Sequence, residues 1–277
     1  MFVYNQWDNF CKKLKDGGFK SITAADALKT KVDTPFLILK HDVETSPSKA
    51  LKLAQIEKKY SHKGSYYVQA YLLNNKKNIS ILKKIQELGH EVSYHHDVMD
   101  SNKGNLEKAK SEFQKNVDLF ENHGFTIETV CQHGNPVIER NGYSSNRDLF
   151  RDRKIAQIYD HITEIMVNFR KRINMDYQYI SDAGYGWKVI FDPENNDIVE
   201  SSDKDKKLED LDEVLHELKK LDPIIISTHP HRWNSNIVLA QTKNTVFKLI
   251  KIATKILLKI PFMKKLMGRF YHLAKKI

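Results

Sequence analysis

Apolar runs alternate with amphipathic segments along most of the chain. Runs rich in β-branched and aromatic residues predict strands within residues 35–40, 64–70, 90–97, 127–134, 177–184 and 223–230. Apolar residues at helical spacing predict helices at 7–19, 46–60, 78–89, 106–124 and 208–221. This alternation predicts an α/β fold, with a parallel sheet or barrel that has its helices outside. Residues 141–172 break the alternation and give no clear pattern.

Residues that can bind metals or transfer protons follow five of these strands. They are His41 and Asp42, then His95, His96 and Asp97, then His133, then Asp182, and finally His229 and His231. Active sites of parallel α/β folds lie at the C-terminal ends of the strands, so these groups are expected to converge at one edge of the sheet. A single histidine after a strand is usually a surface or core residue. The prediction therefore depends on the recurrence of such polar residues after five different strands.

One carboxylate and two imidazoles are a common ligand set for Zn²⁺ and other divalent metals. An open coordination position on such a metal holds water and lowers its pKa, which gives a nucleophile at neutral pH. A further histidine can act as general acid toward a leaving group. These residues therefore predict metal-assisted hydrolysis of an amide or ester. The chain has no G-x-S-x-G, Walker or G-x-G-x-x-G motif, so the usual serine-hydrolase and nucleotide-binding fingerprints are absent.

Charge divides the chain into two parts. The 277 residues carry a net charge of +10, from 45 basic and 35 acidic residues. Ten of the basic residues and none of the acidic ones lie in residues 241–277, which leaves 35 of each in residues 1–240. We therefore expect one neutral domain over residues 1–240, followed by a basic tail over residues 241–277. The two cysteines give no disulfide framework and fit a reducing compartment.

The tail has the pattern of a basic amphipathic helix. Lysines recur at spacings of three and four, at Lys248, Lys251, Lys255 and Lys259, and Pro261 then breaks or kinks the helix. This pattern predicts a helical tail that binds an anionic membrane surface through residues 243–277. The alternative is a helix packed against the domain with a solvated lysine face. We expect no nucleic-acid partner, because the tail has few aromatic residues and no known nucleic-acid motif.

Neither a secretory signal nor a membrane span is expected. The N-terminal sequence MFVYNQWDNF lacks a basic region followed by an apolar one. No window reaches the roughly 18 uncharged apolar residues of a transmembrane helix. We therefore expect a cytoplasmic protein that is peripheral at the inner face of the membrane.

Six motifs in order resemble a known family. They are LILKHDVE (37–44), GSYYVQA (64–70), LGHEVSYHH (88–96), CQHGNP (131–136), YISDAGYGW (179–187) and IIISTHPHRW (224–233). Together they resemble the polysaccharide deacetylases with the NodB homology domain, the carbohydrate esterase family 4 type. The resemblance implies a distorted (β/α) barrel, a divalent metal that is usually zinc, and the removal of N- or O-linked acetyl groups from sugars.

The resemblance also implies roles for single residues. Asp42 matches the metal-binding aspartate, and His95 matches the first metal-binding histidine. His229 matches the histidine that protonates the leaving group. Asp182 and Trp187 match residues that line the substrate pocket.

Two positions depart from the family pattern. The family has its catalytic base, an aspartate, immediately before the metal-binding aspartate, and here that position is His41. An imidazole with a reference pKa near 6.5 can still accept a proton, so we predict His41 as the base, with a purely orienting role as the alternative. The family has its second metal-binding histidine four residues after the first, and here that position is Met99, a poor ligand for Zn²⁺.

The third metal ligand must therefore come from elsewhere in the chain. We predict His133, because it ends a separate strand that faces the same edge of the sheet. Asp97 and His96 are the alternatives. His96 adjoins His95 and points to the opposite side of an extended chain, whereas Asp97 points to the same side.

Further residues have both a functional and a structural interpretation. Arg232 and Trp233 are predicted to bind the sugar, because indole rings stack on sugar faces and guanidinium groups pair with acidic groups, but they can equally close the barrel. Glu44 is predicted to start the following helix, with a role as a hydrogen-bond acceptor near the metal as the alternative. His90 is expected to be structural and Cys131 to be buried and inert.

The leading hypothesis is a metal-dependent deacetylase of a sugar in a bacterial surface glycan or its lipid-linked precursor. A second hypothesis is a glycan-binding homologue without catalytic activity, motivated by the loss of the base aspartate and of the second histidine. A third is a metal-dependent hydrolase that acts on another bond, such as a phosphoester.

Overall fold

The computed structural model describes residues 2–29, 36–135, 138–195, 204–218, 222–243 and 245–246. The predicted tail, residues 241–277, therefore lies outside the described residues from 247 onward, as does residue 244. No helix in the described ranges combines the length and the apolar character needed to span a bilayer.

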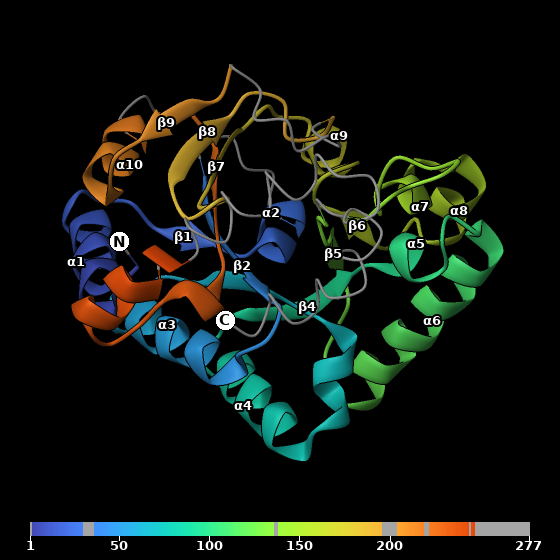
Figure 1. The fold of residues 1–277 in the computed structure, drawn as a ribbon, viewed down its shortest axis with the longest axis horizontal. Coiled ribbons are helices and arrows are strands. Elements are labelled where there is room, and N and C mark those ends of the chain that lie inside the picture. Colours follow the sequence, from blue (N-terminus) through green and yellow to red (C-terminus); the bar gives the residue numbers. More distant parts are fainter. Residues whose placement is uncertain are drawn as a thin grey trace.

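One sheet of ten strands runs through the protein (Figure 1). The strands are β1 (Ser21–Ile22), β2 (Leu37–Val43), β3 (Gly64–Val68), β4 (Glu91–His96), β5 (Thr129–Gln132), β6 (Thr163–Glu164), β7 (Gln178–Ser181), β8 (Trp187–Ile190), β9 (Lys206–Leu208) and β10 (Ile224–Thr228). Their order is β6-β5-β4-β3-β2-β10-β7-β8-β9, with β1 paired to β2.

The sheet is parallel over most of its width. All pairings from β6 to β7 are parallel, and only β7–β8 and β8–β9 are antiparallel. The predicted α/β fold is therefore confirmed. No pairing among the described strands joins β6 to β9, and closure into a barrel stays a prediction.

The helices connect the strands and cover the sheet. They are α1 (Tyr4–Asp16), α2 (Ala24–Lys29), α3 (Pro47–Lys59), α4 (Lys76–Glu87), α5 (Val98–Ser101), α6 (Leu106–Asn122), α7 (Asp148–Arg151), α8 (Arg153–Ile158), α9 (Phe169–Ile173) and α10 (Leu211–Leu218), with 3₁₀ turns η1 (Ala70–Asn74) and η2 (Pro230–Arg232). All five predicted helices are present. In Figure 1, α1, α3, α4 and α6 lie along one side of the sheet.

Local sequence explains where several elements begin. Pro47 occupies the first turn of α3, where its missing N–H costs nothing. The side chains of Asn75 and Asn105 accept backbone hydrogen bonds at the starts of α4 and α6. Residues 141–172 hold only short pieces, namely α7, α8, β6 and the start of α9, which are too brief to show a clear period.

Alternation along β2 separates two environments. Leu37 and Leu39 face a core that contains Trp7 and Ile226, under α1 and α10. Ile38 faces the opposite side, together with Tyr67, Cys131 and Ile225. Because side chains alternate along a strand, Lys40 and Asp42 share the side of Ile38, and His41 shares the side of Leu39. The side of the sheet that carries Ile38, Lys40 and Asp42, called the inner side below, holds the candidate site.

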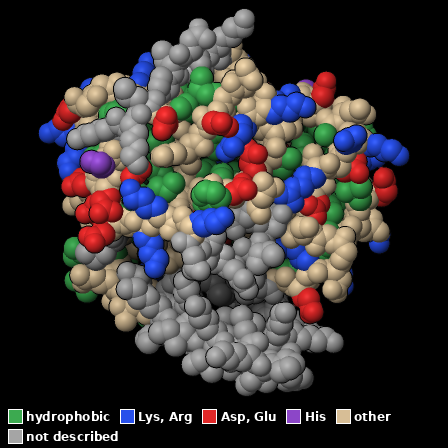
Figure 2. Space-filling model, turned by 90° about the horizontal axis from the view of Figure 1, so that it is seen from above, with side chains coloured by type: hydrophobic (Ala, Val, Ile, Leu, Met, Phe, Trp, Pro, Cys, Tyr) green, Lys and Arg blue, Asp and Glu red, His purple; other side chains and the backbone are tan. Residues whose placement is uncertain are grey.

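The outer surface agrees with the charge balance of residues 1–240. Figure 2 shows basic, acidic and apolar side chains interspersed over the described part of one face. The described part of that face therefore shows no extended region of a single charge sign.

Candidate metal centre

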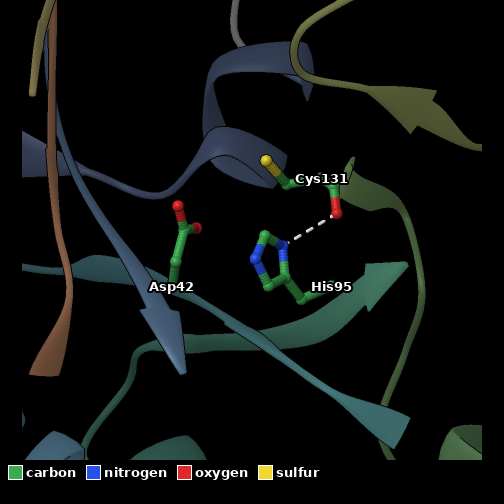
Figure 3. A group of neighbouring side chains, drawn as sticks. All are labelled: Asp42, His95 and Cys131. Carbon is green, nitrogen blue, oxygen red and sulfur yellow. Dashed lines mark hydrogen bonds between the residues drawn. The ribbon is translucent and has the colours of Figure 1, made fainter. Parts of the chain in front are cut away.

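Three strands bring potential ligands into one space at the inner side of the sheet. Asp42 projects from β2 toward the ring of His95 on β4, and Cys131 reaches the same space from β5 (Figure 3). One ligand atom from each of these residues lies within 4.8 Å of the others. Adjacent strands in parallel register produce this meeting, since β4 pairs His95 with Cys131.

A second group of ligands shares His95. The carboxylate of Glu44 and the rings of His95 and His133 also have ligand atoms within 4.8 Å of one another. Oε1 of Glu44 lies 3.2 Å from Nε2 of His133. Glu44 follows β2 directly and stands two residues after Asp42, so alternation carries it to the same side. Asp42 thus shares a group with His95, and His133 shares another with His95, but among the described residues the predicted ligands Asp42, His95 and His133 do not form one group.

His95 is oriented for metal binding. Its Nδ1 lies 3.0 Å from the backbone oxygen of Cys131, to which it can donate, and this leaves Nε2 free to act as a ligand. Burial lowers the pKa of His95 to about 3, which keeps the ring neutral as metal ligation requires. With one ring nitrogen engaged by the carbonyl, His95 can serve only one cation at a time.

Asp42 already has a cationic partner. Nζ of Lys40 lies 2.6 and 2.7 Å from the two carboxylate oxygens of Asp42, and the side chain of Lys40 is only 1% exposed. Burial alone would raise the pKa of Asp42, but Lys40, together with His95 and His229, lowers it to about 2. Burial alone would lower the pKa of Lys40, but Asp42 raises it well above its ordinary value. Both groups are therefore charged at neutral pH.

The donor chemistry favours the second group. Glu44, His95 and His133 supply one carboxylate and two imidazoles, an established set for a catalytic Zn²⁺ with an open position. A cation bound through Asp42 and Cys131 would instead lie beside the ammonium group of Lys40. Burial also raises the pKa of the Cys131 thiol, which disfavours the thiolate that a metal needs. The residues present therefore fit a divalent metal best at Glu44, His95 and His133.

His229 stands over both carboxylates. Its Nε2 lies 3.8 Å from Oδ2 of Asp42 and 3.8 Å from Oε1 of Glu44. Its Nδ1 lies 2.6 Å from Oδ1 of Asp182. The ring is 15% exposed, which makes His229 the most exposed of these ion-paired side chains.

Asp182 is held by four donors. It accepts hydrogen bonds from Nδ1 and the backbone N–H of His229, from the hydroxyl of Thr228 at 2.6 Å and from Arg232 at 2.7 Å. Burial alone would raise its pKa, but Arg232 and His229 hold that pKa well below its ordinary range. Asp182 is itself fully buried, so it orients His229 and has no surface for a substrate.

The other predicted sugar-binding residues lie in structural positions. Trp233 is 0% exposed and donates to Thr228, and Trp187 is 3% exposed, with its ring 5.7 Å from that of Phe2. Neither indole has a free face on which a sugar could stack. Arg232 bonds to Asp182 and supports it. The structure therefore corrects the expectation that Asp182, Trp187 and Trp233 contact substrate, and it gives Arg232 a supporting place.

His41 lies on the opposite face of β2 from Asp42. Its ring is fully buried and stacks on Tyr66 with centroids 4.2 Å apart, and its Nε2 lies 2.8 Å from Oε1 of Glu57 on α3. Neighbouring residues in a strand point to opposite sides, so adjacency to Asp42 in sequence leads away from it in space. This placement corrects the expectation that His41 faces the candidate site as its base.

The alternatives for the third ligand lie away from the site. The ring of His96 is buried against Phe113 and Phe150, at 5.6 and 5.9 Å between centroids, and burial lowers its pKa to about 3. Asp97 stands at the N-cap position of α5. Among the described residues neither belongs to a group that could hold a metal.

Two residues of the site were missed from the sequence. Lys40 was not considered, and Glu44 was assigned to the start of the following helix, with a role as a hydrogen-bond acceptor near the metal only as the alternative. The signal was present in KHDVE, because positions 40, 42 and 44 share one side of an extended chain and position 41 points to the other.

Comparison of the chain with models of known protein families gave no match, and comparison with curated proteins gave none either.

Proposed function

We propose that the protein is a metal-dependent hydrolase that removes acetyl groups from a sugar of a bacterial surface glycan or its lipid-linked precursor. One observation carries the proposal. A carboxylate and two imidazoles, from Glu44, His95 and His133, lie within 4.8 Å of one another. A further carboxylate, Asp42, and a further imidazole, His229, stand beside them.

A divalent cation held by Glu44, His95 and His133 would supply Lewis-acid chemistry, polarising a carbonyl group and acidifying water. Asp42 accepts the proton of the attacking water, as a carboxylate that Lys40 keeps ionised. Oδ2 of Asp42 lies 3.8 Å from Nε2 of His229, so the proposed base and the proposed acid can act on the same bond of the substrate. We therefore assign the role of general base to Asp42 in place of His41, and the role of carboxylate ligand to Glu44 in place of Asp42.

His229 donates a proton to the leaving amine or alcohol. Asp182 accepts from Nδ1 and so leaves Nε2 directed at the site. A buried carboxylate in this position fixes the tautomer and the orientation of the ring. Arg232 and Thr228 donate hydrogen bonds to Asp182. These bonds fix the position of Asp182, and Asp182 in turn fixes the orientation of the His229 ring.

The assignment of an acetylated sugar as substrate, beyond a metal-dependent hydrolase, rests on the ordered motifs between residues 37 and 233. Their resemblance to the NodB-type polysaccharide deacetylases supports a distorted (β/α) barrel and an acetylated sugar as substrate. The observed parallel order β6-β5-β4-β3-β2-β10-β7 agrees with such a fold at the coarser level of a parallel α/β sheet.

The proposal is tested by measuring acetate release. We expect the protein loaded with Zn²⁺ or Co²⁺ to release acetate from N- or O-acetylated oligosaccharides, and chelation of the metal to abolish this release. Model phosphodiesters serve as the parallel substrate. Cleavage of phosphodiesters without release of acetate would support the alternative hydrolase, and failure to bind any divalent metal would support the glycan-binding homologue.

We also propose that the C-terminal part of the domain binds an anionic membrane surface. Residues 237–243 are helical, and Ile237, Val238 and Leu239 are 49%, 63% and 48% exposed. These apolar side chains immediately precede a sequence of ten basic and no acidic residues in 241–277. Exposed apolar residues followed by dense positive charge complement the interface of an anionic bilayer.

Vesicle binding tests this surface. We expect the protein to sediment with vesicles that contain phosphatidylglycerol and not with phosphatidylcholine alone, and added salt to weaken the binding. Changing Ile237, Val238 and Leu239 to Asn should reduce the bound fraction. Phe191→Asn is the matched control, because Phe191 is 64% exposed elsewhere on the protein. Equal binding by the two variants, or equal binding to both vesicle types, would contradict the proposal.

A further inference from the structure

Lys40 is a buried charge within the candidate site. Its ammonium group bonds to both oxygens of Asp42 and lies 3.3 Å from the hydroxyl of Ser227. The rings of Tyr67 and Tyr179 flank it, with Nζ 5.6 and 5.9 Å from their centroids. Burying a lysine costs free energy unless its charge is compensated, and here Asp42 compensates it. The question is what the buried Lys40–Asp42 pair does in the candidate site.

The two groups of potential ligands compete for one residue. Asp42, His95 and Cys131 form one group, and Glu44, His95 and His133 form the other. Nδ1 of His95 faces the backbone oxygen of Cys131, which leaves one nitrogen for one metal ion. Something other than proximity must therefore decide which group the metal occupies.

We propose that Lys40 is an internal cation that excludes a divalent metal from Asp42 and Cys131 and so directs the metal to Glu44, His95 and His133. The inference rests on the proposed metal site. A metal on Asp42 would lie close to the ammonium group in a region of low dielectric, where like charges repel strongly. A metal on Asp42 would also have to displace the short charge-assisted bonds that Lys40 donates to both carboxylate oxygens.

This arrangement gives two neighbouring carboxylates different tasks. Asp42 is paired with Lys40 and stays outside the coordination sphere, where it can accept a proton. Glu44 lies 3.2 Å from His133, and none of its described close contacts is to a lysine or arginine. Lys40 is thus a positioning residue that acts through Asp42.

Cobalt spectroscopy tests the proposal, because a thiolate ligand gives Co²⁺ a charge-transfer band that nitrogen and oxygen ligands do not give. We expect the wild-type protein loaded with Co²⁺ to lack this band and Cys131→Ser to leave the spectrum unchanged. Lys40→Met removes the charge and keeps a similar length. We expect it to gain the thiolate band, and Lys40→Met with Cys131→Ser to lose the band again.

The wild-type comparison remains decisive even if Lys40→Met fails to fold. A thiolate band in the wild-type protein that disappears in Cys131→Ser would overturn the role of Lys40 and leave the metal-dependent hydrolase intact. A folded Lys40→Met variant with the wild-type cobalt spectrum would overturn it as well. Failure of the wild-type protein to bind Co²⁺ would overturn this proposal together with the proposed function.

Discussion

Replacing Asp42 with Asn is expected to lower the rate of acetate release by about 10²–10⁴-fold, the usual contribution of a general base. The metal content of the protein should stay unchanged, because the metal is held by Glu44, His95 and His133. Asn keeps the size of the side chain and an oxygen that can accept from Lys40, but it cannot take a proton. The rate is measured as acetate released by the zinc-loaded protein, and the metal content by elemental analysis.

Glu44→Gln is the matched comparison for Asp42→Asn. It makes the same change from acid to amide two residues further along the chain, and we expect it to lose most of the bound metal as well as the activity. Loss of the metal in Asp42→Asn with retention in Glu44→Gln would reverse the two assignments. That result would restore Asp42 as the ligand, as the resemblance alone implies.

Replacing Glu57 with Ala is expected to lower the free energy of unfolding by about 3–5 kcal/mol, the cost of removing one partner from a buried charged network. The carboxylate is fully buried and lies 2.8 Å from Nε2 of His41, and it accepts from the indole of Trp7 and the hydroxyl of Tyr66. Nδ1 of His90 lies 3.6 Å from it. Urea denaturation measures the loss. Glu107→Ala, at a side chain that is 80% exposed, is the control and should change stability by less than about 0.5 kcal/mol.

The contribution of Glu57 also sets a pH dependence. Burial alone would raise the pKa of Glu57, but His41 and His90 lower it below the value in the unfolded chain. A carboxyl group with a lowered folded pKa stabilises the protein fully above the unfolded pKa, near 4.3, and loses this contribution as the pH falls through the folded pKa. The difference in stability between the wild-type protein and Glu57→Ala should therefore shrink as the solution is acidified. A difference that grows on acidification would contradict this network.

Much of the fold could be predicted from the sequence because its elements carry clear local signals. The apolar run before His41 predicts β2, and Pro47 predicts the start of α3. The antiparallel strands β8 and β9 were not predicted. β9 is the three-residue segment Lys206–Leu208, and such a short segment carries no period that distinguishes it from a loop.

The candidate site could be predicted only in part. Repetition of polar residues after strands indicated that Asp42 and His133 each lie near His95, because parallel strands end at a common edge. The direction of each side chain was harder to predict, since every residue of β2 is buried and the strand has no exposed face to set its register. His41 was therefore assigned to the site, although it points into the core. Trp233, which follows η2, is also buried in the core. Lys40 was overlooked because a lysine in a strand is rarely buried.

The most direct test of the central claim is an anomalous difference map from crystals of the zinc-loaded protein, measured at the zinc absorption edge. The account predicts one peak about 2.0–2.2 Å from a carboxylate oxygen of Glu44 and from ring nitrogens of His95 and His133. The ammonium group of Lys40 should remain on Asp42. A peak bonded to Asp42 and Cys131, or no peak at this edge of the sheet in crystals grown with excess zinc, would contradict the account.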